Sequence, residues 1–242
     1  EEKLEAYRSS FSEEQLDAMV EKTKALEAYQ EAGEDPKALE CIPMLKRSDI
    51  KREAAKIINE ELMVDDSLFL YHDVCTNGIG YVDLMFKTDS IAPEQIPYLG
   101  LLKSVLGYVD TENYTYGELF NEINANTGGI NCGVEVFDRA DSTEEFQAMF
   151  SVRGKALYTK MDFLFKMIGE ILNSSKLEDT KRLYEIVASV KSRAQVNLTG
   201  AGHSTAVLRA AAYSSPMAAF QDEMAGIGYY QFIEKLEKDF EQ

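Results

Sequence analysis

Residues 93–137 read PEQIPYLGLLKSVLGYVDTENYTYGELFNEINANTGGINCGVEVF, and this stretch decides the fold class. The spacing of its apolar residues predicts a helix over Pro93–Val109 with one buried face. Thr115, followed three residues later by Glu118, predicts a second helix that begins with a capping box. A strand is expected over Ile130–Phe137. The buried face of the first helix is expected to contain Ile96, Leu99, Leu102, Val105, Leu106 and Val109.

Strand-like runs lie on both sides of this stretch. Leu68–Cys75 and Ile79–Thr88 are separated by a turn that contains Asn77-Gly78, a pair that tolerates the positive φ angles of tight reversed turns. We therefore predict a hairpin between these two runs. A further strand is expected over Phe146–Lys155, after the polar connection RADSTEE.

The remainder of the chain has helical periodicity. Apolar residues repeat at helical spacing over residues 161–172 and 183–194, and a final helix is expected over Tyr229–Phe240. Gly200 and Gly202 predict a break between helices. Strand pair, helices, strand pair, helices is the order of an α+β fold, in which helices cover an antiparallel or mixed sheet.

An N-terminal helical arm precedes this body. Ser12 is a candidate N-cap with Gln15 three residues on, and Phe11 and Leu16 stand where a hydrophobic staple would close. Residues 34–49 contain two prolines and predict an extended tether. We expect two parts: an arm and linker over residues 1–59, and an α+β domain over residues 60–242.

Composition limits the classes of partner. The chain has 242 residues, with 42 Asp plus Glu against 25 Lys plus Arg and a formal charge of −17, so nucleic acid and anionic membranes are disfavoured as partners. Three widely spaced cysteines, without a secretory signal or a long apolar run, predict a soluble protein with reduced thiols. The expected location is the cytoplasm, or an organelle matrix in a eukaryote.

Several fragments, in this order, resemble one family. They are FSEEQLDAMVEKTKALEAYQ from Phe11, IPMLKRSDI from Ile42, MFKT from Met85, PYLGLL from Pro97, YTYGELFNEINANTGGI from Tyr114, GHSTAVLRAAAYSSP from Gly202 and GIGYYQFIEKL from Gly226. The chain resembles the peptidase-associated middle segment of pitrilysin, or insulinase-type, zinc metallopeptidases of the presequence-protease branch. The similarity extends over nearly the whole chain.

The resemblance implies a clamshell of four related domains in the parent, with two halves joined by a helical hairpin. This chain would supply part of the hairpin and the third domain, whose last strands would follow residue 242. The family's first domain binds zinc through an inverted His-x-x-Glu-His motif on a helix. The equivalent helix here, Gly100–Gly107, carries none of these ligands, so zinc is expected only in the catalytic domain of the parent.

Independent tests of the residues also predict no metal or catalytic group. Catalytic zinc needs about three protein ligands, and the only histidines are His72 and His203. His72 and Cys75, three apart in a predicted strand, would point to opposite faces. His203 and Ser204 are neighbours on a predicted helix and diverge by about 100°, so helix capping by Ser204 is the simpler interpretation. We assign no catalytic, metal-ligating or substrate-binding residue.

Three functional hypotheses follow. The first is a non-catalytic structural domain of a zinc metalloendopeptidase that degrades unstructured oligopeptides, with this segment inactive by itself and its partners the remaining domains of the parent. The second is a peptide-binding or assembly scaffold without a proteolytic parent. The third is an autonomous hydrolase based on His203-Ser204. Uncovered sheet edges and the apolar stripe of the arm also predict self-association of the segment.

Overall fold

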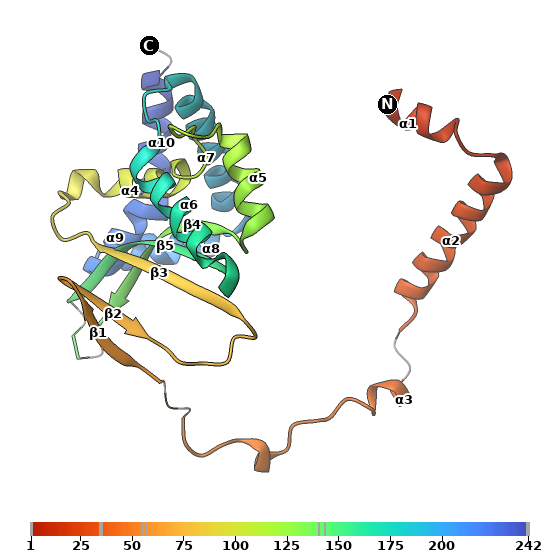
Figure 1. Ribbon diagram of the computed structural model, residues 1–242, viewed down its shortest axis with the longest axis horizontal. Coiled ribbons are helices and arrows are strands. Elements are labelled where there is room, and N and C mark those ends of the chain that lie inside the picture. The colour runs from red at the N-terminus through yellow and green to blue at the C-terminus, as the bar shows by residue number, and fades with distance from the viewer. Residues whose placement is uncertain are drawn as a thin grey trace. The chain divides into compact units, whose positions relative to one another are not determined.

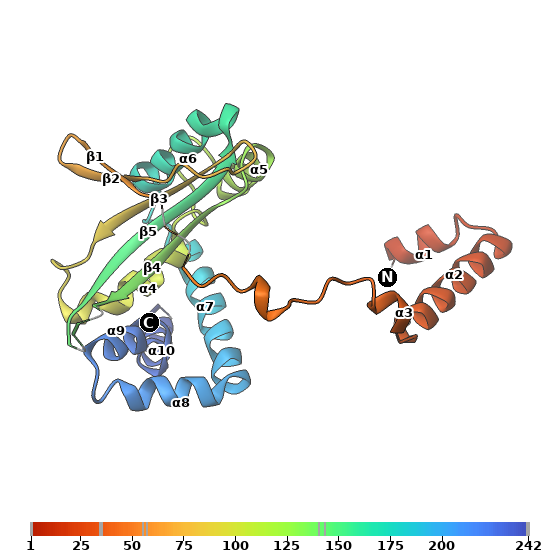
Figure 2. The same ribbon diagram turned by 90° about the horizontal axis from the view of Figure 1, so that it is seen from below.

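The computed structural model describes residues 2–33, 36–54, 56, 58–139, 141–142 and 144–240 (Figures 1 and 2). The start of the predicted tether, Glu34 and Asp35, and two positions of the RADSTEE connection, Ala140 and Thr143, lie outside this set. The chain divides into two compact units, residues 1–73 and 74–242. Each unit is described by itself.

The first unit begins with helices. They are α1 (Glu2–Arg8), α2 (Glu13–Glu31) and the short α3 (Pro36–Leu39), followed by the 3-10 turn η1 (Arg47–Asp49). The predicted capping box is confirmed: the backbone N–H of Gln15 donates to Ser12 Oγ at 3.2 Å, and Gln15 Oε1 accepts from the N–H of Ser12 at 2.9 Å. The prediction that the whole tether is extended is wrong, because Pro36 tolerates the first turn of a helix and α3 forms there.

The first unit also contains a hairpin. Strands β1 (Glu60–Val64) and β2 (Ser67–Tyr71) pair antiparallel, and Val64 lies opposite Ser67. Asp65, in the connecting turn, has a φ of 52°. Every residue of the two strands is exposed within the chain.

The predicted hairpin across Asn77-Gly78 is wrong. Asn77 and Gly78 do adopt the positive φ angles of 52° and 83° that the prediction requires, but they form a turn that leads into β3 (Ile79–Lys87). The partner of β3 is β5 (Phe146–Leu157), over a register of nine residues. β2 has only five residues, so β5 gives β3 a longer ladder and more cross-strand contact.

The sheet of the second unit has the order β3-β5-β4, with all pairs antiparallel. β4 (Ile130–Asp138) agrees closely with its predicted range, and β5 is the central strand. Alternate residues of β5 point to opposite faces. Val152 is fully buried, whereas the neighbouring Arg153 is half exposed on the other face.

A 3-10 turn and two helices connect β3 to β4. The turn η2 (Pro93–Gln95) leads into α4 (Ile96–Val105), and α5 (Tyr116–Asn126) follows. α4 ends four residues before the predicted Val109, because the chain turns at Gly107, which has a φ of 84°. The second predicted capping box is confirmed by the 3.3 Å bond from the N–H of Glu118 to Thr115 Oγ1.

Five helices complete the second unit. They are α6 (Met161–Ser174), α7 (Thr180–Gly200), α8 (Gly202–Ala211), α9 (Pro216–Ala225) and α10 (Ile227–Phe240). The predicted break at Gly200 and Gly202 is confirmed, since α7 ends and α8 begins at these residues. The order of elements and the antiparallel pairing confirm the α+β fold class.

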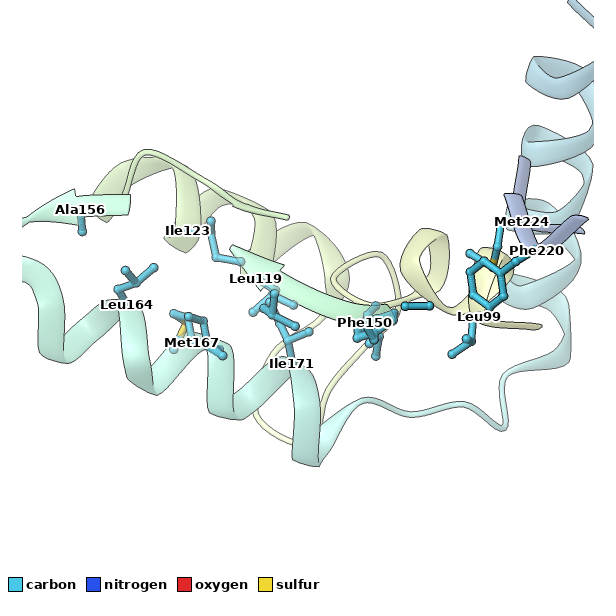
Figure 3. Packing of buried hydrophobic residues seen from close by; sticks show 14 residues of the cluster. Leu99, Leu119, Ile123, Phe150, Ala156, Leu164, Met167, Ile171, Phe220 and Met224 are labelled. Carbon is cyan, nitrogen blue, oxygen red and sulfur yellow. The ribbon is translucent and has the colours of Figure 1, made fainter. Parts of the chain in front are cut away.

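Two hydrophobic clusters hold these elements together. The larger one lies between one face of the sheet and the helices α4, α5, α6 and α9; Figure 3 shows Phe150 of β5 beside α6. The smaller one joins α4, α7 and α10, and its buried members include Val105, Val187 and Ile233. α4 contributes to both clusters and is therefore central to the packing of the second unit.

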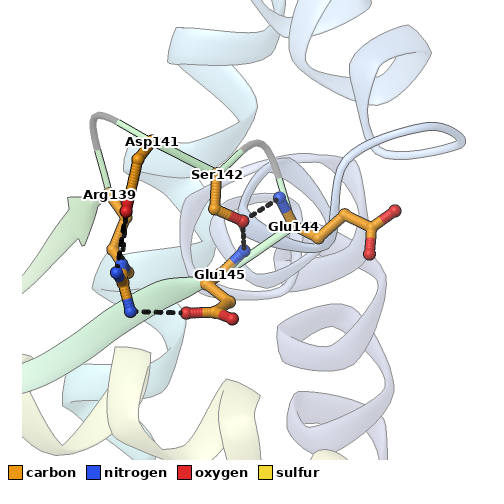
Figure 4. A network of polar contacts seen from close by, with 5 residues as sticks. All are labelled: Arg139, Asp141, Ser142, Glu144 and Glu145. Carbon is orange, nitrogen blue, oxygen red and sulfur yellow. Dashed lines mark hydrogen bonds and ion pairs between the residues drawn. The ribbon is translucent and has the colours of Figure 1, made fainter.

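Charged groups order the connection between β4 and β5 (Figure 4). Arg139 contacts the carboxylates of Asp141 and Glu145, each at 2.9 Å, and Ser142 Oγ accepts from the N–H groups of Glu144 and Glu145. All of these residues lie on the surface. The contacts shape a surface turn, and exposed ion pairs of this kind contribute little to stability.

Candidate functional site

The helix α4 is filled with packing contacts where the resemblance would place zinc chemistry. Its buried residues are Pro97, Leu99, Gly100 and Val105, none of which can ligate a metal. A Cβ atom at Gly100 would lie 2.7 Å from Tyr229 Cε2, so α4 and α10 approach closely at this point. Across the part of the chain that the structure describes, no three His, Cys, Asp or Glu side chains are grouped so that they could hold a metal ion.

The histidines lie in separate units. His72 follows the end of β2, so the predicted strand over Leu68–Cys75 is too long at its C-terminal end. The ring atom His72 Nδ1 lies 2.7 Å from the carbonyl oxygen of Ile58, which accounts for one polar group of the ring. His203 lies in the first turn of α8 and is exposed.

The capping role predicted for Ser204 is wrong. α8 begins at Gly202 and its N-cap is Ala201, so Ser204 already lies inside the first turn. The reason is that the chain passes almost directly from α7 into α8, which moves the start of the helix ahead of the serine. His203 and Ser204 are therefore successive helical residues whose side chains diverge, a poor arrangement for a base and its nucleophile.

The cysteines are free thiols in the described structure. Cys41 and Cys75 are exposed, and Cys132 is partly buried on β4. Burial raises the pKa of the Cys132 thiol to about 11. At neutral pH this side chain is an uncharged thiol with little nucleophilic character.

Two carboxylates are buried and bound by hydrogen bonds. Asp222 accepts bonds from the backbone N–H groups of Ile227 and Gly228, each at 3.1 Å, and pairs with Arg209. Glu170 accepts three bonds from Asn113, at 2.9 to 3.2 Å. Both carboxylates have their acceptor capacity engaged in fixing loops and helix ends, which is a structural role.

A charged triad lies on the sheet face opposite the core. Arg153 Nε is 2.6 Å from Asp83 Oδ2, and Arg153 Nη1 is 3.0 Å from Glu135 Oε1. The three residues belong to β5, β3 and β4, so the arginine bridges all three strands. Because both acids pair with the same cation, the triad serves cross-strand pairing better than acid–base chemistry.

A small cavity lies at the end of α4, between α4, α5 and the start of β4. Its volume is about 210 Å³. Lys103 is the single charged side chain among the described residues that line it, and burial lowers the pKa of this lysine. Sequence reasoning missed the site, although Lys103 stands four residues after Leu99 and three before Leu106, on the apolar face of the helix.

A family model matches nearly the whole chain. It describes the segment associated with the peptidases of metallopeptidase family sixteen, subfamily C, and it matches residues 1–236. The α+β architecture and the extent of the match show that this chain belongs to that peptidase-associated family. The resemblance inferred from the sequence fragments is thereby confirmed.

Similar curated proteins extend the comparison. The chain is 36% identical over 237 residues to Protein HypA of Clostridium perfringens, which covers 98% of this chain and 24% of that protein. It is 29% identical to Presequence protease 1, chloroplastic/mitochondrial, of Arabidopsis thaliana, over 99% of this chain and 22% of the relative. It is 28% identical to the mitochondrial presequence protease of Saccharomyces cerevisiae, over 96% and 24%. The chain thus spans about a quarter of the length of these relatives.

The helices are short or polar in comparison with a membrane span. Among the described residues, none of the helices combines the length and the apolar character that a membrane crossing demands. The polar features that a functional argument can use are the cavity beside Lys103, the triad around Arg153, and the buried carboxylates of Glu170 and Asp222.

Proposed function

We propose that this segment is a non-catalytic structural part of a zinc metallopeptidase that degrades unstructured oligopeptides. Residues 60–242 would form part of the wall of a closed chamber, and residues 1–59 would belong to the linker between the two halves of the parent. The observation that carries the proposal is the apolar packing of α4, whose position in the family pattern corresponds to the zinc helix of the catalytic domain. Membership of the peptidase-associated family supports it.

The charge of the chain supports the choice of substrate class. With a formal charge of −17, the segment attracts basic and amphipathic peptides and raises their local concentration at a chamber wall. Two of the similar proteins named above are called presequence proteases. Zinc would belong to the catalytic domain of the parent and not to this segment.

The test is to compare the isolated segment with the same segment joined to the polypeptide that precedes and follows it. Zinc content and cleavage of an unstructured peptide are measured on both samples. The expected result is zinc and cleavage in the joined protein, with neither in the isolated segment. Stoichiometric zinc that supports turnover in the isolated segment would end the proposal.

A scaffold module is the second candidate, and the surface of the arm favours it. The apolar residues Met19 and Val20 of α2 are about half exposed, and they lie with Leu16 and Arg8 along one groove. Such a stripe is suited to a second helix. The sequence upstream of residue 1 separates the two candidates, because an inverted zinc motif there supports the peptidase and its absence supports the scaffold.

Self-association of the isolated segment stays a prediction. Large apolar residues are exposed on the β1–β2 hairpin, including Met63, Leu68 and Phe69. Sedimentation of the isolated segment over a range of concentrations checks it, and the joined protein serves as the control.

A further inference from the structure

We propose that the cavity between α4, α5 and β4 is a binding site for a carboxylate group, held by the ammonium of Lys103. The chemistry fits the C-terminal carboxylate of a short peptide or a small free carboxylic acid. Only the peptide source rests on the function proposed above; carboxylate binding itself does not.

The size of the cavity limits the ligand. At about 210 Å³ it is smaller than the 300 Å³ or more that is typical of pockets for drug-sized molecules. It exceeds the space of roughly 30 Å³ that one water molecule occupies in the liquid. The cavity therefore accepts one amino-acid residue or a small organic acid, and excludes a nucleotide or a folded partner.

The charge of the lining selects an anion. The chain contains 42 Asp plus Glu, yet no carboxylate is among the described residues that line this cavity. Within the described chain, Lys103 has no ion pair and no hydrogen bond to its ammonium. An ammonium withdrawn from water without a counter-charge is destabilised, and a bound carboxylate offsets that cost.

The remaining polar lining agrees with this charge. Asn124 and Asn131 lie in the lining with Tyr108, and their amide and hydroxyl groups are donors of the kind that a carboxylate accepts. Cys132 also lines the cavity, and as a protonated thiol it adds no negative charge that would compete with the ligand.

The other walls are apolar. They are formed by Leu106, Phe120, Ile123, Ile130 and Ile171. An apolar surface beside a cation favours a ligand whose carboxylate is attached to a hydrocarbon group. A C-terminal leucine or a branched-chain acid has this combination, which is why the matched ligands below carry a leucine side chain.

The experiment uses the 242-residue chain and calorimetric titration with N-acetyl-leucine and N-acetyl-leucinamide. These two molecules differ in the charge of the terminal group and match in apolar surface. We expect saturable binding of the acid, and at least about ten-fold weaker binding of the amide, as a charge-assisted hydrogen bond requires. Equal binding of both molecules, or binding of neither, overturns the proposal.

Variants assign the binding to the cavity. Lys103→Met is expected to lose the preference for the acid, Lys103→Arg to retain it, and Lys181→Gln, an exposed lysine on α7, to leave it unchanged. Circular dichroism checks that each variant is folded. If Lys103→Met does not fold, the Lys103→Gln variant takes its place, and a preference for the acid that persists in a folded variant without a charge at residue 103 overturns the proposal.

The source of the carboxylate is resolved by two further ligands. A pentapeptide that ends in leucine is titrated beside succinate. Tighter binding of the peptide supports a peptide terminus as the ligand, whereas tighter binding of succinate supports a free acid. Both outcomes uphold the carboxylate site. Because no cleavage is measured, the result is independent of the test of the parent peptidase.

Discussion

The guanidinium of Arg209 on α8 lies 2.5 Å from the carboxylate of Asp222 on α9, and the side chain of Asp222 is only 1% exposed. The same carboxylate accepts the first free N–H groups of α10, from Ile227 and Gly228. One buried acid therefore fixes the ends of three helices. An anion at a helix N-terminus is also favoured by the helix dipole.

Replacing Asp222 should destabilise the second unit strongly. Asp222→Ala leaves two buried N–H groups unpaired and frees Arg209, and we expect a loss of about 3 kcal/mol in the free energy of unfolding. Urea denaturation followed by circular dichroism measures it. Arg209→Ala is the matched control and should cost less, because the two N–H bonds to Asp222 remain. Equal costs for the two variants would contradict the assignment of the cap.

Gly100→Ala should disrupt the contact between α4 and α10. The added Cβ would lie 2.7 Å from Tyr229 Cε2 and 2.9 Å from the backbone oxygen of Met224, and the backbone oxygen cannot move aside freely. We expect a loss of about 1–3 kcal/mol from overpacking. Thermal unfolding provides the measurement.

The control for this prediction is another helical glycine. A Cβ atom at Gly117 of α5 would meet nothing within 4 Å. Gly117→Ala should therefore be neutral or stabilising by up to about 1 kcal/mol, because alanine favours the helix. A Gly100→Ala protein as stable as the parent would show that the helices do not approach in this way.

Acid should weaken the second unit through Glu170. The neighbouring Thr111 side chain and the hydrogen bonds from Asn113 lower the pKa of Glu170 from its ordinary value of 4.5. Since the folded pKa is lower than the unfolded one, the stabilisation is present above 4.5 and is lost as the pH falls through the folded pKa. Urea denaturation at about pH 7, 4.5 and 3 measures the effect. Glu170→Gln should be less stable at about pH 7 and should lose less stability on acidification.

Adjacent residues on β5 should respond very differently to truncation. Val152 is fully buried, so Val152→Ala should cost about 2 kcal/mol or more through the cavity that it leaves. Arg153 is 49% exposed, so Arg153→Ala should cost less than about 1 kcal/mol, despite its two ion pairs. Chemical denaturation of the two variants, with high salt added to screen the triad, separates the contributions. Comparable costs would contradict the assigned faces of the strand.

Local signals in the sequence predict local structure well here. The capping boxes at Ser12 and Thr115 form as expected, because each depends on residues only three positions apart. The expected burial of Leu99, Val105 and Val109 is confirmed, although α4 ends before Val109. Periodicity determines which face of an element is apolar, and that face then finds the core.

Long-range pairing could not be predicted in the same way. Asn77-Gly78 turns the chain as predicted, yet the turn does not decide which strand lies beside β3, because that choice depends on the length and burial of β5, far along the chain. Lys103 and Asp222 show the same limit. Their neighbours come from other helices or from β4, so their burial becomes visible only when the elements are assembled.

The order β3-β5-β4 has a consequence for synthesis on the ribosome. β5 lies between the other two strands, yet it is the last of the three to be translated, and Ile79 pairs with Leu157. While β3 and β4 emerge, neither has its hydrogen-bonding partner, and the nascent chain exposes two unpaired strands until residue 157 leaves the exit tunnel. Binding of a chaperone to stalled nascent chains should therefore fall sharply once β5 has emerged.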